Sequence, residues 1–459
     1  MAQPSPSDLI FTVRRQKPEI ISPAKPTPHE IKPLSDLDDQ HFLRMQISLI
    51  HFYRPKPSMA GKEPVKAIRE ALAQTLVFYY PFAGRLKEGG GRKLMVDCNE
   101  EGVMFTEADA DVTLQQFGDD LHPPFPCLQD LLHSPPGSDE ILHRPILLIQ
   151  VTRLKCGGFI FGIRVTHCLC DGPGIVQFLN SLAEFANGAT EPSIQPVWHR
   201  ELLNARDPPR VSCTHHEYDE EVIDTKNPST NTILRSFFFG PTEISSLGRL
   251  LPDHLRQSSS FEVVTACLWL CRTRALQLDP QKDVRMMIVV NARFGHNKLD
   301  PPLPKGYYGN ATMFPAAIST AGKLCESPLG YALELVKKAK AEVDEEYLRS
   351  TIDLIATKRP RLCGILRSCM VSDLSYLGFG DVDFGWGKAV YAGIAKNPLE
   401  TFQGLTAYVG YKNSKGEAGR VVPICLPQEC MERFAKELDC LLNGVPQEIQ
   451  ESTSVIAEL

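Results

Sequence analysis

A histidine and an aspartate four residues apart are the residues of this sequence best suited to acid–base chemistry. They are His167 and Asp171 in the stretch RVTHCLCDGPG, residues 164–174, which follows a strand-like run and ends in a Gly-Pro turn. A neutral imidazole can abstract a proton near pH 7. Across a tight turn that includes Gly172, this spacing lets Asp171 hold the turn while His167 projects from the end of the strand. We therefore predict that His167 is a general base and that Asp171 supports it.

Other interpretations of this stretch come from its cysteines and from the histidine itself. A structural zinc site usually contains paired C-x₂-C knuckles, whereas Cys168 and Cys170 are spaced C-x-C. A cysteine nucleophile is also disfavoured, because neighbouring residues of an extended strand point to opposite faces, so that His167 cannot easily activate Cys168. A purely structural histidine stays an open alternative. We expect no metal site.

The segments on either side of this stretch have to position it. Two apolar runs, 145–154 and 159–166, are separated by Lys-Cys-Gly-Gly and predict a β-hairpin that ends just before His167. Pro173 suits the first turn of a helix over 173–187, with Ile175, Leu179 and Leu182 on one face. The histidine is thus expected between a buried strand and a helix.

The rest of the chain alternates helical and strand-like patterns. Apolar residues keep a 3.6-residue period over 65–76, which predicts a helix that ends before Pro81. Ser259 with Glu262 three residues later forms a capping box for a helix that continues to residue 276. A buried-strand pattern follows over 284–293. This mixture predicts α/β layers in each half of the chain.

The bulk properties favour two domains. With 459 residues the chain is longer than a single core usually allows, because cores stop growing near ~250–300 residues. We expect an N-terminal domain over 1–200, a crossover linker over 201–230 and a C-terminal domain over 231–459. The linker is rich in proline and charge, and its His215, His216 and Glu217 are expected on the surface.

The charge and the termini narrow the possible partners. The net charge of −6 does not favour nucleic acid, which calls for a basic stripe. The N-terminus lacks the apolar core of a signal peptide, and no run is long enough for a membrane span. We therefore expect a cytoplasmic protein with no membrane partner, in which the 14 cysteines are free thiols.

Two motifs resemble signatures of the plant BAHD acyltransferase family. The His-x-x-x-Asp-Gly pattern at 167–172 resembles the first, and Asp-Phe-Gly-Trp-Gly at 383–387 resembles the second and more specific one. A protein kinase, which also carries Asp-Phe-Gly, is disfavoured because the other kinase motifs are missing. Further blocks of the chain also resemble the family, at 34–40, 75–86, 290–293, 306–310 and 421–427. The resemblance therefore covers nearly the whole chain. It is greatest to the alcohol acyltransferases that form benzoyl esters and fruit esters.

The resemblance implies a fold and a reaction. The fold is two chloramphenicol-acetyltransferase-like α/β domains that meet along a solvent channel, with a segment near 383–405 returning to the first domain. The reaction transfers an acyl group from acyl-CoA, a co-substrate rather than a bound cofactor, to a small-molecule alcohol. His167 takes the hydroxyl proton, and no acyl-enzyme forms because a thioester is already activated. The resemblance also implies a monomer.

By the same resemblance Arg293 is the partner of Asp171. An arginine can clamp a carboxylate with two hydrogen bonds, which would hold the loop of His167 and tie the two halves together. A simple turn role for Asp171 remains the alternative.

The second motif leaves two interpretations open. Asp383 is either a second proton acceptor or the anchor of its own loop, where Gly385 and Gly387 favour a tight turn. Trp386 carries an indole N–H that could reach the oxyanion, or it packs in the core. We treat both residues as catalytic candidates.

The coenzyme site and the acceptor are less defined. The helix that begins at Ser259 and Ser260 could meet a pantetheine or phosphate group with its N-terminus, although ordinary capping explains the same residues. An alkaloid or other specialised-metabolite alcohol is an alternative acceptor. A protein that binds acyl-CoA without catalysis is the alternative from another class, and the intact motifs argue against it.

Overall fold

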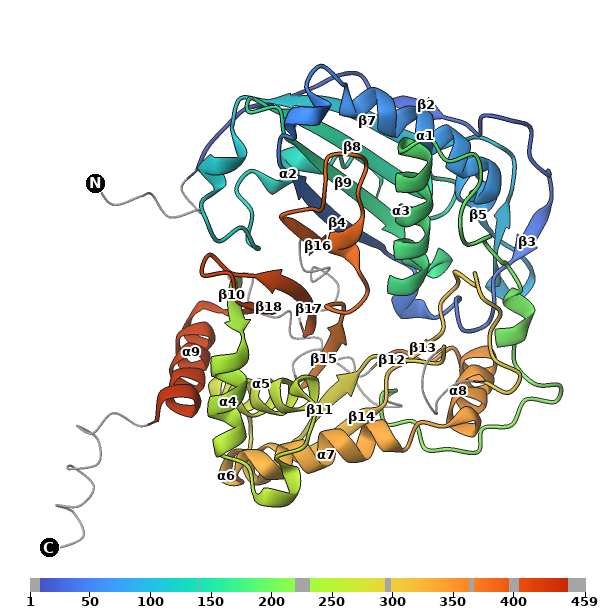
Figure 1. Cartoon of the computed structure of the whole chain (residues 1–459). Helices are drawn as coiled ribbons and strands as arrows, with labels where there is room; N and C mark the ends of the chain where they lie inside the picture. The colour runs from blue at the N-terminus through green and yellow to red at the C-terminus, as the bar shows by residue number, and fades with distance from the viewer. Residues whose placement is uncertain are drawn as a thin grey trace, which may run out of the picture.

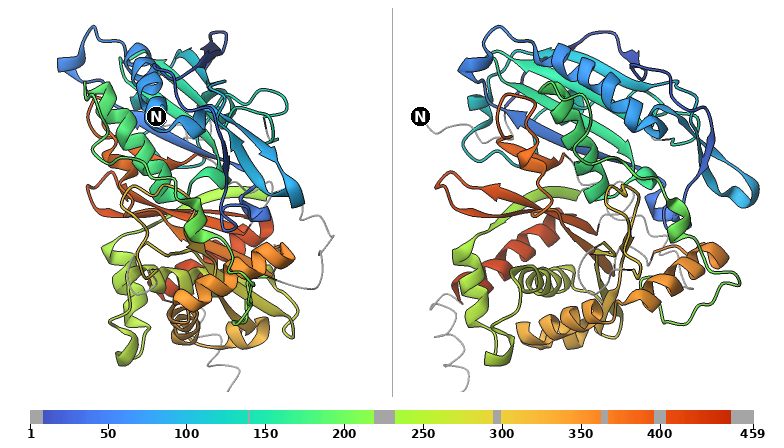
Figure 2. Two further views of the ribbon diagram at one scale, coloured as in Figure 1. Left: turned by 90° about the vertical axis from the view of Figure 1, so that its right-hand side faces the viewer. Right: turned by 45° about the vertical axis from the view of Figure 1, so that its right-hand side comes forward.

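The computed structural model describes residues 9–138, 140–218, 232–293, 299–362, 367–395 and 404–444. Two sheets, each covered by helices, organise these residues (Figure 1). The first sheet belongs mainly to the first 190 residues and the second to the part of the chain after residue 231. Figure 2 shows the two halves one above the other. The predicted α/β fold with two sheets is confirmed.

The first sheet has the strand order β1-β7-β8-β9-β4-β16, with β2 also paired to β7. Its last strand comes from far along the chain, because Tyr391 of β16 pairs with Phe52 of β4. The segment after the Asp-Phe-Gly-Trp-Gly motif therefore lies in the first sheet. The strands are β1 Val13–Arg15, β2 Glu19–Ile21, β4 Gln46–Tyr53, β7 Val103–Ala110, β8 Leu147–Leu154, β9 Phe159–Thr166 and β16 Tyr391–Ile394.

Helices α1 Pro64–Phe78 and α3 Gly172–Ala186 pack together against this sheet (Figure 1). Helix α3 begins where the carboxylate of Asp171 accepts the N–H of Gly174, and Pro173 occupies its first turn. Its apolar stripe, which includes Ile175 and Leu179, is fully buried. Both predicted helices and the β8–β9 hairpin are confirmed.

The second sheet has the order β10-β18-β17-β15-β11-β14, and β15 runs parallel to both of its neighbours. Its strands are β10 Thr232–Phe239, β11 Asp283–Ile288, β14 Ala316–Thr320, β15 Ser368–Asp373, β17 Leu405–Lys412 and β18 Ala418–Pro427. The helices of this half are α4 Pro241–Arg249, α5 Ser260–Leu276, α6 Ala321–Glu326, α7 Leu329–Ala341, α8 Glu345–Lys358 and α9 Gln428–Asn443.

Small elements complete the fold. They are the three-stranded sheet of β3 Ile31–Pro33, β5 Arg85–Glu88 and β6 Leu94–Asp97, the pair β12 Val290–Asn291 and β13 Thr312–Met313, and the short helix α2 Leu128–Leu131. The strand predicted over 284–293 is therefore divided at Val289 into β11 and β12. The predicted capping box at the start of α5 is confirmed.

The crossover segment after α3 docks on α8 as far as residue 218, and the remainder of the predicted linker, 219–230, lies outside the described residues. The prediction that its histidine-glutamate cluster lies on the surface is wrong for two of the three residues. Glu217 is fully buried and accepts the hydroxyl of Tyr347 at 2.8 Å, and His215 is buried beside Ser350 at 2.8 Å. Residues of α8 thus satisfy this segment's polar groups.

Candidate active site

His167 lies directly after the most enclosed strand of the first sheet. Strand β9 pairs with β8 on one side and β4 on the other, and all eight of its residues are buried. His167 opens the 3₁₀ turn His167–Leu169, and its backbone N–H donates to the carbonyl of Met45 at 2.8 Å. Because both neighbouring strands hold β9, the position of His167 is defined by the sheet rather than by a free loop.

The imidazole of His167 lines a cavity of about 90 Å³ where the two halves of the chain meet. Its Nδ1 atom is buried and has no hydrogen-bond partner among the residues that the structure describes. Burial lowers the pKa of His167, and the nearby carboxylate of Asp171 only partly offsets this. The ring is therefore neutral near pH 7, which is the state that can accept a proton.

The wall of this cavity is almost entirely apolar. The first half of the chain contributes residues near β4 and α3, including Ile47 and Ile175. The second half contributes residues near β15, including Met370. Apart from His167 and Asp171, the polar side chains among the described lining residues are those of Thr312 and Ser372. Such a wall suits an uncharged, largely hydrocarbon ligand.

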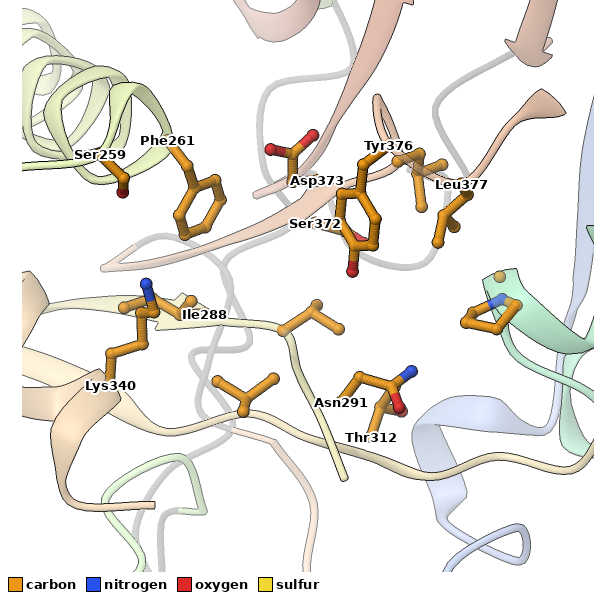
Figure 3. Close-up of a pocket in the computed structure, with 15 residues that line it drawn as sticks. Ser259, Phe261, Ile288, Asn291, Thr312, Lys340, Ser372, Asp373, Tyr376 and Leu377 are labelled. Atoms are coloured by element: carbon orange, nitrogen blue, oxygen red, sulfur yellow. The ribbon is translucent and has the colours of Figure 1, made fainter. Parts of the chain in front are cut away.

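A second cavity of about 340 Å³ adjoins the first and shares Gly172, Val289, Thr312, Ser372 and Leu374 with it. Figure 3 shows it extending between the labelled Tyr376 and Leu377 on one side and the start of α5 on the other. At that end, Ser259, Phe261 and Lys340 line it. A long flexible ligand in this cavity would reach the cavity of His167.

The two serines predicted at a coenzyme site differ in position. Ser259 lines the second cavity and caps α5, where its hydroxyl accepts the N–H of Glu262 at 3.3 Å. Ser260 is not among the described lining residues, and its hydroxyl accepts a hydrogen bond from Arg420 at 3.0 Å. Lys340, which sequence reasoning missed, places its ammonium 2.7 Å from Glu262 at the same cavity.

Asp171 joins the two halves of the chain, as its predicted partner requires. One carboxylate oxygen accepts the N–H of Gly174 at 3.1 Å, and the other accepts the N–H of Ala311 at 3.1 Å and Nη1 of Arg293 at 2.5 Å. The expected two-pronged clamp is absent, because Nη2 of Arg293 donates to the carbonyls of Tyr307 and Gly309 instead.

Glycines allow the close packing around this carboxylate. A Cβ atom on Gly174 would lie 2.1 Å from the carbonyl oxygen of Tyr308, and one on Gly172 would lie 2.7 Å from the side chain of Leu377. The first contact involves rigid backbone, so no larger residue fits at Gly174.

Asp383 lies at the far end of α3 from His167. Its Oδ1 accepts the N–H groups of Gly385 and Gly387, each at 2.7 Å, and both glycines have left-handed φ angles of +106° and +93°. Its carbonyl accepts the side chain of Asn187, the residue that ends α3. Since α3 has 15 residues, its two ends are about 22 Å apart. The structure does not bring Asp383 to His167.

Trp386 is equally remote. Its ring packs edge-on against Phe159, with 5.4 Å between ring centroids, and only 5% of the residue is exposed. Phe159 begins β9 and His167 follows its end, so their backbones are about 25 Å apart along the strand. Neither cavity described above includes Trp386 among its described lining residues.

Comparisons with known proteins agree with this architecture. A family model described as the Transferase family matches residues 11–441. The chain belongs to this family. This member of the family is 59% identical to a benzyl alcohol O-benzoyltransferase of Petunia hybrida over 96% of each chain. It is also 54% identical to a 13-hydroxylupanine O-tigloyltransferase of Lupinus albus over 95% of this chain and 96% of the other.

Solved structures share the fold. Vinorine synthase aligns with a TM-score of 0.71 over 94% of this chain and 98% of its own at 22% identity. F. sporotrichioides TRI101, complexed with coenzyme A and T-2, aligns with a TM-score of 0.64 over 89% and 97% at 19% identity. The predicted membership of the BAHD acyltransferases and the predicted enzyme class, an alcohol O-acyltransferase, are confirmed.

Three further observations concern metal ligands, the thiols near His167 and the length of the helices. The described residues contain no group of three histidine, cysteine or acidic side chains placed to hold a metal ion. Burial raises the pKa of the Cys168 and Cys170 thiols, so both stay protonated beside the histidine. None of the described helices is long and apolar enough to cross a membrane.

Sequence reasoning also missed three residues next to His167. Asp38, Arg200 and Asn310 form a buried cluster against the backbone of the 167–169 turn. Two of them lie in blocks, 34–40 and 306–310, that the resemblance singled out without assigning a role. Arg200 is the last residue of the predicted N-terminal domain, directly before the predicted linker, where nothing in the sequence indicates burial.

Proposed function

We propose that this enzyme transfers an acyl group from acyl-CoA to the hydroxyl of a small, uncharged, largely apolar alcohol, with His167 as the general base. The observation that carries the proposal is the neutral imidazole of His167, which faces an apolar cavity where the two halves meet. A second cavity leads from this point to the N-terminus of α5. Because the two cavities adjoin, the reacting ends of two substrates can meet beside His167, which lines the smaller one.

In the proposed step, the alcohol oxygen attacks the thioester carbonyl while a ring nitrogen of His167 accepts the hydroxyl proton. The tetrahedral intermediate then expels coenzyme A as a thiolate, which takes the proton back from the imidazolium. A covalent acyl-enzyme is not needed, and the buried protonated thiols of Cys168 and Cys170 are poor nucleophiles. A positioned base contributes ~10²–10⁴-fold to such a reaction.

We assign the coenzyme to the larger cavity. At its α5 end, the helix N-terminus favours negative charge, and the ammonium of Lys340, which Glu262 pairs with at 2.7 Å, lines the cavity. A second lysine, Lys337, places its ammonium 3.2 Å from Ser258 just before the helix. Of the two serines predicted to bind the coenzyme, Ser259 lines this cavity, which supports its role there. The hydroxyl of Ser260 instead accepts a hydrogen bond from Arg420.

The apolar cavity favours a neutral acceptor over an alkaloid cation. Among the described lining residues, Asp171 is the one carboxylate, and Arg293 already neutralises it at 2.5 Å. A protonated amine in this cavity would therefore lose hydration without gaining a counter-ion. Two relatives to which the chain is similar are named for benzyl alcohol, a neutral apolar alcohol, which agrees with a neutral acceptor.

We propose structural roles for Asp383 and Trp386. The carboxylate of Asp383 holds the 383–387 turn, and Trp386 covers the start of β9. A monomeric state and a cytoplasmic location stay predictions from the sequence.

The test is a screen of purified protein with acetyl- and benzoyl-CoA against benzyl alcohol, hexenol, methanol and a tropane or quinolizidine alcohol, followed by thiol release and ester detection. We expect ester from the neutral alcohols, and loss of nearly all turnover in His167→Ala with an unchanged thermal midpoint. Activity near wild type in that variant would disprove the role of His167. Coenzyme binding without thiol release from any pair would favour a non-catalytic binding protein.

A further inference from the structure

A buried ion pair lies beside the turn that carries His167. The side chains of Arg200 and Asp38 are 2% and 0% exposed, and Nη1 of Arg200 donates to the two carboxylate oxygens at 2.9 and 3.0 Å. Asp38 also accepts the backbone N–H and the side-chain amide of Asn310, at 2.9 and 2.8 Å. We call Asp38, Arg200 and Asn310 the support cluster.

The support cluster holds the backbone of the turn at both ends. The amide of Asn310 donates to the carbonyl of His167 at 2.9 Å, and Nη2 of Arg200 donates to the carbonyl of Leu169 at 2.8 Å. These are the first and last residues of the 3₁₀ turn His167–Leu169. No member of the cluster lines either cavity, so none can touch a substrate there.

The surroundings are shaped to hold the guanidinium. The ring centroids of Trp198 and Tyr308 lie 4.4 and 5.0 Å from Cζ of Arg200. A Cβ atom on Gly309 would lie 1.7 Å from Nη1 of Arg200, so the main chain passes the guanidinium at a distance that only glycine allows. A buried ion pair adds little stability over an apolar replacement, so folding alone does not explain why an ion pair occupies this place.

We propose that Asp38, Arg200 and Asn310 are positioning residues that set the placement of His167 for catalysis. The inference rests on the proposed role of His167 as the base. Its physical ground is that misplacing a reacting group by about 1 Å can cost about 10²-fold in rate. Asp38 and Arg200 belong to the chain up to the crossover segment, whereas Asn310 belongs to the second half. The placement of His167 therefore also depends on the docking of the two halves.

The cluster also acts on the charge of the ring. The carboxylates of Asp171 and Asp38 raise the pKa of His167 against the effect of burial. Arg293 and Arg200 face these carboxylates and limit that effect. Neutralising Asp38 removes a negative charge and leaves Arg200 unpaired, and both changes lower the pKa of His167.

The experiment compares Asp38→Asn with Asp353→Asn. The control is matched, because Asp353 is also fully buried and accepts hydrogen bonds from one arginine of the crossover segment, Arg206, and from two backbone N–H groups. It lies in α8 and lines neither cavity. Both variants should lose stability, which thermal unfolding measures. Steady-state kinetics well below each midpoint then separate the roles.

In Asp38→Asn we expect kcat to fall about 10–100-fold, with each KM changed less than about twofold. The acid limb of its pH–rate profile should move to lower pH. The control should keep the wild-type kcat per folded molecule and the wild-type pH profile. Equal losses of kcat in both variants, or a wild-type kcat and profile in Asp38→Asn, would overturn the proposal.

A second variant decides the matter if Asp38→Asn does not fold. Asn310→Ala removes the donor to the carbonyl of His167 but leaves the Asp38–Arg200 pair intact, and it should also lower kcat at constant KM. Unchanged kcat there would contradict the proposal. His167→Ala is assayed alongside: if it stays active, the proposed function fails, whereas if it is inactive and both support variants are normal, only this inference fails.

Discussion

Replacing Asp171 with asparagine removes one charge at the point where the two halves meet, and the structure sets the expected cost. The carboxylate is 2% exposed and accepts hydrogen bonds from Gly174, Ala311 and Arg293. The new amide group would face at least one of these donors with a donor of its own. Leaving a buried charge, here that of Arg293, without its partner costs about 3–5 kcal/mol.

This cost predicts a modest shift in the melting temperature. At about 2.1 cal/mol/K of unfolding entropy per residue, a chain of this length gains about 1 kcal/mol/K if it unfolds as one unit. A loss of 3–5 kcal/mol then lowers Tm by roughly 3–5 °C. Calorimetry or dye-based unfolding of wild type and Asp171→Asn measures this shift.

The same change should lower activity by loosening the turn between His167 and α3. We expect kcat to fall about 10–100-fold, because a displaced base forfeits much of its ~10²–10⁴-fold contribution. Loss of the Asp171 charge also lowers the pKa of His167, so the acid limb of the pH–rate profile moves to lower pH. An Asp171→Asn enzyme with wild-type Tm, kcat and pH profile would refute the reasoning. Asp353→Asn again serves as the control for stability loss alone.

Three further outcomes follow from other parts of the structure. Lys340→Ala should raise the KM for acyl-CoA about fivefold, the effect of one partly exposed charge, without changing the KM for the alcohol; equal changes in both would contradict the assignment of the second cavity. Asp383→Asn should lower Tm but keep most of kcat, because its carboxylate holds a turn; inactivity at wild-type stability would restore a catalytic role. Burial lowers the pKa of His51 to about 3, so its contribution to stability is complete above about pH 6.5 and is lost as the pH falls toward 3. The free energies of unfolding from denaturant titrations at pH 7 and pH 5 should therefore differ less in His51→Gln than in wild type, by about 2 kcal/mol, and identical differences would refute this.

Local patterns were sufficient to predict the elements around the site. The hairpin before His167 and the helix after it follow from apolar runs, a glycine turn and Pro173, all within 45 residues of one another. The capping box at Ser259 was visible for the same reason, since its two partners are three residues apart. Such features depend on hydrogen bonds and side-chain spacing that the chain forms with its own neighbours.

Long-range placement was less accessible. The sequence offered Asp383 and Trp386 as catalytic candidates because motif residues are often functional, but only the packed structure shows them at the far ends of α3 and β9. In the same way, the position of Arg200 directly before the predicted linker gave no sign of its burial, and Glu217 was expected in solvent.

The sequence by itself indicated, through two motifs, the family and its reaction, and it predicted His167 as the base at the end of a buried strand. Only the tertiary structure decided which distant residues surround His167. The imidazole becomes neutral and exposed to an apolar cavity because the second half of the chain packs over the end of β9. That packing joins Asp171 to Arg293 across 122 residues of chain, the pair that the resemblance implied, whereas the contact of Asp38 with Arg200 across 162 residues was visible only in the structure. Such contacts depend on the summed burial of many side chains, which no local pattern encodes.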